Sequence, residues 1–146
     1  MVWQGLIVGG LDWRAVLAKD DGSELQTPAS ADEVGRVEAL LVAVFAADLR
    51  ALYLVSDGVF DKAGQWFVVW PLAKVVERNQ SAWVEGDVTR RQLVGFGDDG
   101  AGAVFCVPRD GDGGVFVWGP IDQQAYRLAG TVAEFWSGWA MGMITT

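Results

Sequence analysis

Residues 95–107 read Gly-Phe-Gly-Asp-Asp-Gly-Ala-Gly-Ala-Val-Phe-Cys-Val, an apolar segment that breaks into a glycine- and aspartate-rich turn and then resumes. The pattern recurs at once over residues 107–118, where a second Asp-Gly turn separates two apolar segments. Glycine reaches positive φ without steric cost and aspartate bonds its own backbone, so both segments indicate β-hairpins. Two consecutive hairpins predict an antiparallel meander.

Further strand candidates extend this meander in both directions. An apolar segment ends at Pro71, and a weaker candidate follows the two hairpins. The sequence therefore predicts a sheet of about five strands. These are Gln65–Trp70, Gln92–Phe96, Ala103–Val107, Val115–Trp118 and Gln124–Leu128.

Helices are predicted before and after the meander. Ser30 and Glu33 have the spacing of a capping box, and Thr131 and Glu134 repeat it. Apolar residues at helical spacing follow the first box to Phe45 and the second to Met143. This order predicts one α+β domain over residues 1–146, with the helices on one face of an antiparallel sheet. Shorter helices are expected at Leu11–Lys19, Ala46–Ser56 and Pro71–Arg78, and polar loops at Asp20–Ala29 and Asn79–Thr89.

The composition narrows the chemistry that the chain can perform. Its 146 residues include one cysteine and no histidine, which excludes Ser-His-Asp and Cys-His catalysis and His-liganded zinc. Cys106 lies in an apolar segment and is interpreted as a small buried hydrophobe. No cofactor is expected. The longest apolar run, Ala39–Ala47, is far short of the roughly 20 residues that span a bilayer, and no secretory signal is visible, so we expect a cytoplasmic protein.

The chain is strongly acidic, with 19 Asp and Glu residues against 11 Lys and Arg residues and a net charge of −8. Such a field repels nucleic-acid phosphates and anionic membranes. It favours a basic protein partner and accelerates encounter with it. The alternative is that the acidic surface serves solubility alone.

Three motifs that would carry other chemistry are set aside. The aspartates of the two hairpins lack the spacing of an EF-hand loop, so no metal site is expected. Gly95, Gly97 and Gly100 match the dinucleotide-binding pattern by letter, but a strand follows them where that motif needs a helix. A glycosidase-like pair such as Glu85 and Asp99 is conceivable, although no spacing selects any pair among so many carboxylates.

Several segments follow one another in an order that is informative as a whole. They are Pro28–Ser30 opening a helix that contains Glu38, then Asp48–Val59, Trp70–Val76, the turn Val94–Gly102 with the strand Gly114–Trp118, and a closing helix with Phe135 and Trp136. This order resembles the SUKH superfamily, which includes the fungal cell-wall-synthesis regulator and many bacterial immunity proteins against secreted toxins. The resemblance covers residues 28–143, and the chain departs from it where Val44–Ala47 stands in place of the Leu-Pro that the family often has.

This resemblance implies a non-enzymatic protein-binding module, of the kind that in bacteria neutralises a toxin, often a nuclease, by covering its active site. Trp83, in an expected polar loop, is either an interface anchor or a lid folded onto the sheet. Reversing Asp98 and Asp99 to lysine is expected to weaken binding and to leave folding intact. The candidate contact residues, chosen for charge, loop position and family region, are Asp57, Asp61, Trp83, Glu85, Asp98 and Asp99.

Two alternatives to an immunity protein stay open at this stage. The first is a regulatory or scaffold protein of the same fold, which binds a non-toxin partner or a second copy of itself. The second is a small enzyme that uses carboxylates, which requires a carboxyl group with a strongly raised pKa in a cleft. The sequence does not predict the oligomeric state.

Overall fold

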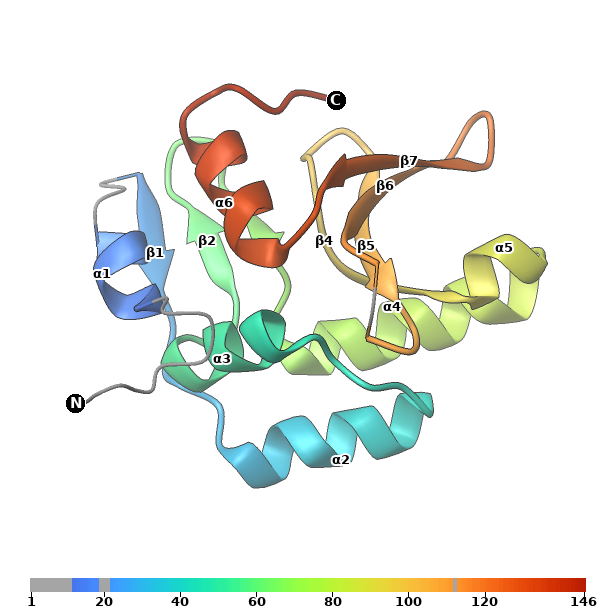
Figure 1. The fold of residues 1–146 in the computed structure, drawn as a ribbon, viewed down its shortest axis with the longest axis horizontal. Helices are drawn as coiled ribbons and strands as arrows, with labels where there is room; N and C mark the ends of the chain where they lie inside the picture. Colours follow the sequence, from blue (N-terminus) through green and yellow to red (C-terminus); the bar gives the residue numbers. More distant parts are fainter. Residues whose placement is uncertain (1–11, 19–21, 112) are drawn as a thin grey trace.

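The computed structural model describes residues 12–18, 22–111 and 113–146. Seven strands in this part of the chain form one antiparallel sheet in sequential order, so each strand pairs with the next along the chain (Figure 1). The strands are β1 (Ser23–Leu25), β2 (Val59–Asp61), β3 (Trp66–Val69), β4 (Leu93–Asp98), β5 (Val104–Pro108), β6 (Val115–Gly119) and β7 (Gln124–Ala129). The described helices are α1 (Trp13–Ala18), α2 (Ala31–Leu41), α3 (Ala47–Val55), α4 (Leu72–Glu85), α5 (Val88–Arg91) and α6 (Val132–Ala140).

The α+β meander is confirmed, with seven strands where about five were expected. The two additional strands, β1 and β2, have three residues each. β1 lies within the expected loop Asp20–Ala29 and pairs with β2 through Ser23 and Asp61. Strands this short carry too few residues for an alternating pattern to show in the sequence. The ends of the helix expected at Leu11–Lys19 lie outside the described residues.

The first hairpin of the meander joins β4 to β5, as its turn sequence predicts. The register shifts by a bulge between Gly95 and Gly97. At Gly97 a Cβ atom would lie 1.9 Å from the carbonyl oxygen of Val68 on β3. Only glycine allows the two strands to approach this closely.

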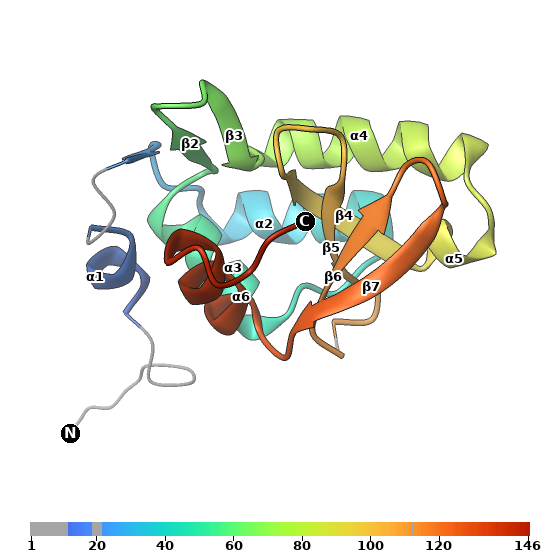
Figure 2. The same ribbon diagram turned by 90° about the horizontal axis from the view of Figure 1, so that it is seen from above.

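One face of the sheet forms the main core together with α6. Phe135 of α6 is fully buried, and its ring centroid lies 4.6 Å from that of Phe105 and 5.9 Å from that of Phe96. Trp139 adds an edge contact to Phe105 at 5.1 Å. Figures 1 and 2 show α6 packed against the sheet, with α2 and α4 running side by side. The aromatic residues that define the predicted closing helix are therefore core residues; the helix ends at Ala140, before Met143.

The opposite face of β4–β6 carries a second, smaller cluster of buried side chains, Leu93, Cys106 and Trp118. Burial raises the pKa of the Cys106 thiol to about 12, against a smaller opposing effect of the Arg90 charge. The thiol is therefore protonated at neutral pH. This agrees with the interpretation of Cys106 as a small buried hydrophobe.

The first capping box forms as predicted: the Ser30 hydroxyl accepts from the Glu33 amide, and the Glu33 carboxylate accepts from the Ser30 amide. The helix ends earlier than expected, at Leu41, because Val42 takes a left-handed φ of 50°. Phe45 thus lies beyond α2.

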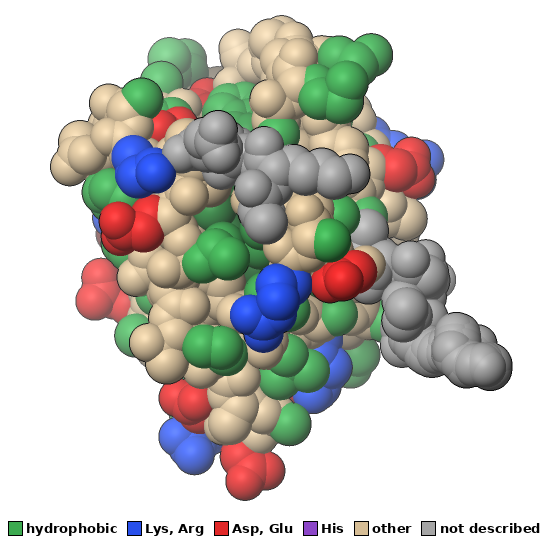
Figure 3. Space-filling view, turned by 90° about the vertical axis from the view of Figure 1, so that its left-hand side faces the viewer, with side chains coloured by type: hydrophobic (Ala, Val, Ile, Leu, Met, Phe, Trp, Pro, Cys, Tyr) green, Lys and Arg blue, Asp and Glu red, His purple; other side chains and the backbone are tan. Residues whose placement is uncertain are grey.

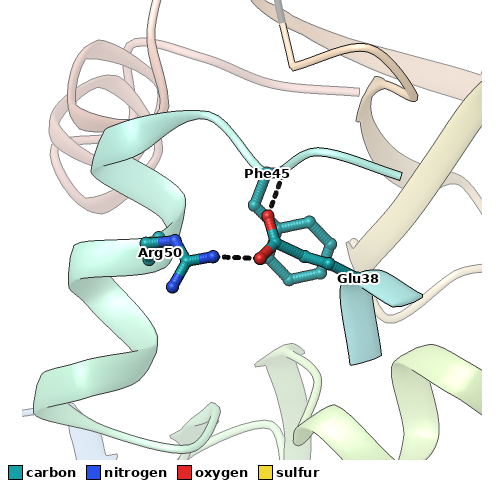
Figure 4. Close-up of polar contacts among 3 residues, drawn as sticks. All are labelled: Glu38, Phe45 and Arg50. Carbon is teal, nitrogen blue, oxygen red and sulfur yellow. Dashed lines mark hydrogen bonds and ion pairs between the residues drawn. The ribbon is translucent and has the colours of Figure 1, made fainter. Parts of the chain in front are cut away.

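The connection from α2 to α3 is held by Glu38. Its carboxylate accepts the Phe45 amide at 2.8 Å and forms an ion pair with Arg50 (Figure 4). One carboxylate of α2 thus fixes both the connecting segment and the first turn of α3. Glu38 belongs to the segments that resemble the family, but the sequence predicts no contact for it.

The helix after Pro71 is longer than predicted. It was expected to end at Arg78, but α4 continues to Glu85, and α5 occupies part of the expected loop Asn79–Thr89. Asn79 is fully buried, so it occupies a position where helical periodicity expects an apolar residue. Among the described residues no helix is both long enough and apolar enough to cross a membrane.

Candidate protein-binding surface

Two turns that carry predicted contact residues lie at the same edge of the sheet, at the top of Figure 1. Asp61 begins the β2–β3 turn, where its Oδ1 accepts the amides of Ala63 and Gly64 at 2.9 and 3.0 Å. Trp66 is the register partner of Asp61, and its indole Nε1 donates to the Asp98 carbonyl of the β4–β5 turn at 3.1 Å. Trp66 thus joins the two turns. We call this surface, with Asp61, Asp98 and Asp99, the acidic edge.

The β4–β5 turn is built by its own aspartates. Asp98 accepts the indole Nε1 of Trp70 at 2.7 Å through Oδ2 and the Gly100 amide at 2.8 Å through Oδ1. Asp99 accepts the amides of Ala101 and Ala103 and the hydroxyl of Thr146. Both side chains are partly exposed. Replacement of both by lysine removes these acceptors, so we expect that variant to lose stability as well as charge.

Asp57 has a different position and a structural contact. It follows α3, and its Oδ1 accepts the amide of Leu72, the first residue of α4, at 2.8 Å. Pro71 precedes α4 without offering a side-chain acceptor. Asp57 therefore caps α4 from a distant part of the sequence.

Replacing Asp57 with alanine is expected to lower the free energy of unfolding by about 1 kcal/mol, because an amide at the start of α4 loses its acceptor. Asp57→Asn, which keeps an acceptor oxygen, is the control and is expected to lose less. Urea denaturation followed by tryptophan fluorescence measures both. An alanine variant as stable as the parent protein would show that the cap does not contribute.

Trp83 and Glu85 lie on α4 and not on a loop. The Trp83 indole is half-buried, donates from Nε1 to the Leu93 carbonyl at 3.0 Å, and is covered by the Arg109 guanidinium, 3.9 Å from the ring centroid. This geometry corresponds to the lid alternative of the sequence analysis. Glu85 is exposed near the end of the same helix. Its role as a contact residue stays a prediction.

The excess of acidic side chains is not spread evenly over the surface. Figure 3 shows the face over α1 and β1, where acidic and basic side chains alternate with hydrophobic ones. Several carboxylates elsewhere serve the fold: Asp48 of α3, for example, accepts the amide of Ala133 at 3.1 Å and so caps α6. The charge available to a partner is therefore that of the partly exposed carboxylates at the acidic edge and of exposed acids such as Glu85.

The described residues contain no group of three or more His, Cys, Asp or Glu side chains placed to hold a metal ion. Two polar residues on α4 and α5 are buried, which the sequence does not predict. Asn79 and Arg90 are 0% and 4% exposed, and they contact each other. Asn79 begins the expected polar loop and Arg90 directly follows it, and their polarity gives no sign of burial. Only the spacing of Val75, Asn79 and Trp83, four residues apart, indicates a shared helical face.

The model of the SMI1 / KNR4 family (SUKH-1) matches residues 28–138. This range runs from the segment before α2 into α6 and contains all the predicted contact residues. No curated protein matches the chain.

Proposed function

Because the chain belongs to the SMI1 / KNR4 family (SUKH-1), as the match over residues 28–138 shows, we propose that it is a bacterial immunity protein that binds and neutralises a cognate toxin, such as a nuclease. The family comprises immunity- and regulator-type modules and is generally non-catalytic. Family membership carries the proposal. In this proposal the protein acts by binding alone, and this function requires no catalytic residue and no cofactor.

The charge of the molecule supports a basic partner. With a net charge of −8, the protein attracts a basic surface over several ångströms and accelerates its encounter. The acidic edge presents carboxylates that short turns hold in place, which limits the entropy lost on binding. Carboxylates in this arrangement resemble the phosphates that a basic nuclease cleft binds.

The test begins with capture of partners by tagged protein from the source cells, at low and at high salt, followed by mass spectrometry. The expected result is one basic protein that salt releases, that is toxic when expressed alone, and that becomes harmless when this chain is co-expressed. A captured protein that is not toxic alone, or that stays toxic when this chain is co-expressed, does not meet this expectation. A partner that is not toxic, or self-association alone, would contradict the toxin proposal in favour of a regulatory or scaffold role.

The contact surface is tested with variants that keep the turns. Asp61→Asn with Asp99→Asn preserves an acceptor oxygen for each turn and removes two charges. The matched control, Asp32→Asn with Glu77→Gln, removes two charges at exposed helical positions. We expect the first pair to slow association with the captured partner about threefold to tenfold at low ionic strength, with the difference fading at high salt. Equal effects of both pairs would remove the acidic edge from the interface.

A further inference from the structure

A cavity of about 400 Å³ lies between α4, the start of α5 and the outer face of β5 and β6. Its size is in the range of small-molecule sites. Its inner part is lined by Trp70, Trp118 and Arg90, which are 1%, 8% and 4% exposed, whereas Arg78, Glu85 and Asp87 are exposed at the mouth. None of Asp61, Asp98 and Asp99 lines this cavity, although the indole Nε1 of Trp70 donates to Asp98 and so connects the cavity to the acidic edge.

Arg90 is the unusual residue of this cavity. Its side chain is 4% exposed, and its guanidinium donates to the Leu93 carbonyl at 2.9 Å and to Asn79 Oδ1 at 3.4 Å. Both acceptors are neutral, and a guanidinium has more N–H donors than these two contacts use. Among the described residues the one ion pair joins Arg50 to Glu38, so no described carboxylate pairs with Arg90. Buried cations in proteins are ordinarily paired.

Arg90 and the Trp70 ring both pack against the backbone at Gly95, where there is no room for a side chain. At Gly95 a Cβ atom would lie 3.2 Å from Arg90 Nη2 and 3.3 Å from the Trp70 ring. The Asp87 carboxylate accepts the Arg90 amide at 3.0 Å and caps α5, which fixes the backbone of Arg90. The positive charge is thus held in place inside a cavity with aromatic walls.

We propose that this cavity binds a carboxylate carried on an aromatic ring, with the carboxylate paired to Arg90 and the ring against Trp70 and Trp118. Arg78, whose guanidinium lies 5.6 Å from the centroid of the Trp70 ring, attracts the anion at the mouth. Glu85 and Asp87 at the same mouth disfavour a doubly charged phosphate more than a singly charged carboxylate. A free aromatic acid and the C-terminal aromatic residue of a peptide share this chemistry. The proposal does not depend on toxin binding.

The experiment titrates indole-3-acetate into the protein and follows the tryptophan indole N–H signals by NMR. Its neutral counterpart indole-3-acetamide, inorganic phosphate, and a short peptide ending in a tryptophan carboxylate are titrated in parallel. We expect the acid to shift the Trp70 and Trp118 signals and to bind at least about tenfold more tightly than the amide, because a charge-assisted hydrogen bond to Arg90 is lost in the amide. Tighter binding of the free acid or of the peptide identifies the source of the ligand.

Two variants locate the anion contact. Arg90→Gln is expected to abolish the preference for the acid over the amide. Arg78→Gln changes an exposed residue and is expected to weaken binding of the acid several-fold. Lys74 also lies near the Trp70 ring, at 5.7 Å, but does not line the cavity, so Lys74→Gln is expected to leave binding unchanged. If Arg90→Gln does not fold, the comparison of acid with amide and the Arg78→Gln variant still test the proposal. Equal binding of acid and amide, tighter binding of phosphate, or equal effects of the Arg78 and Lys74 variants would overturn the proposal.

Discussion

Replacing Phe135 with alanine is expected to lower the free energy of unfolding by about 4 kcal/mol. Phe135 is fully buried where α6 meets the sheet, and its ring contacts those of Phe96, Phe105 and Trp139. The truncation removes apolar burial and leaves a cavity between α6 and the paired strands β4 and β5. Urea denaturation, with an unchanged slope against denaturant, measures the loss.

Met143→Ala is the control for this prediction. Met143 lies beyond the end of α6 and is 77% exposed, so its truncation is expected to change stability by less than about 0.5 kcal/mol. A loss below about 1.5 kcal/mol for Phe135→Ala would show that α6 collapses onto the sheet and refills the space. In that case the aromatic cluster would not be the main attachment of α6.

The meander could be predicted because its turns have local causes. The glycines and aspartates of residues 95–107 determine where the strands reverse, independently of the rest of the chain. Gly100 and Gly102 have φ of 82° and 108°, which the turn requires. The capping box at Ser30 is equally local, and it formed as predicted.

The second capping box shows where local prediction fails. The Thr131 hydroxyl accepts the Glu134 amide as expected, but the Glu134 carboxylate accepts from that hydroxyl and not from the Thr131 amide, so only half of the box forms. The neighbouring Ala133 amide is capped by Asp48, far away in the sequence. Asp57 caps α4 in the same way. Which carboxylate reaches which helix depends on the tertiary fold, so a sequence pattern identifies acids without showing which of them are free to meet a partner. Asp57 is such an acid: it has a structural contact at the start of α4, and its role as a contact residue stays a prediction.

Length and burial explain the errors in secondary structure. β1 and β2 are too short for their alternation to be recognised, and they form because the neighbouring strand supplies hydrogen-bond partners. The predicted end of α4, at Arg78, is too early because the polar residues Arg78–Ser81 indicate a loop when each is judged by its own polarity. One of these residues, Asn79, faces the interior, and Trp83 one turn later covers the start of β4.

The role of Asn79 follows from the way β3 leaves the sheet. β3 pairs with β4 through Val69 and Gly97, and the chain then turns into α4 at Pro71. At Gly95 the Asn79 side chain takes the place of a neighbouring strand: Nδ2 donates to the Gly95 carbonyl at 2.8 Å, and Oδ1 accepts the Gly95 amide at 2.7 Å. A side-chain amide has both groups that a strand backbone would offer.

Asn79→Ala is therefore expected to lower the free energy of unfolding by about 3–4 kcal/mol, because the buried amide and carbonyl of Gly95 both lose their partner. Asn79→Leu restores volume without hydrogen bonds, so we expect it to be as unstable as the alanine variant. Gln80→Ala, at an exposed position of the same helix, is the control and is expected to be close to the parent protein. Recovery of stability by leucine would show that packing, and not the paired amide, is what Asn79 contributes. Urea denaturation measures these losses, which include the acceptor that Arg90 loses when Asn79 Oδ1 is removed.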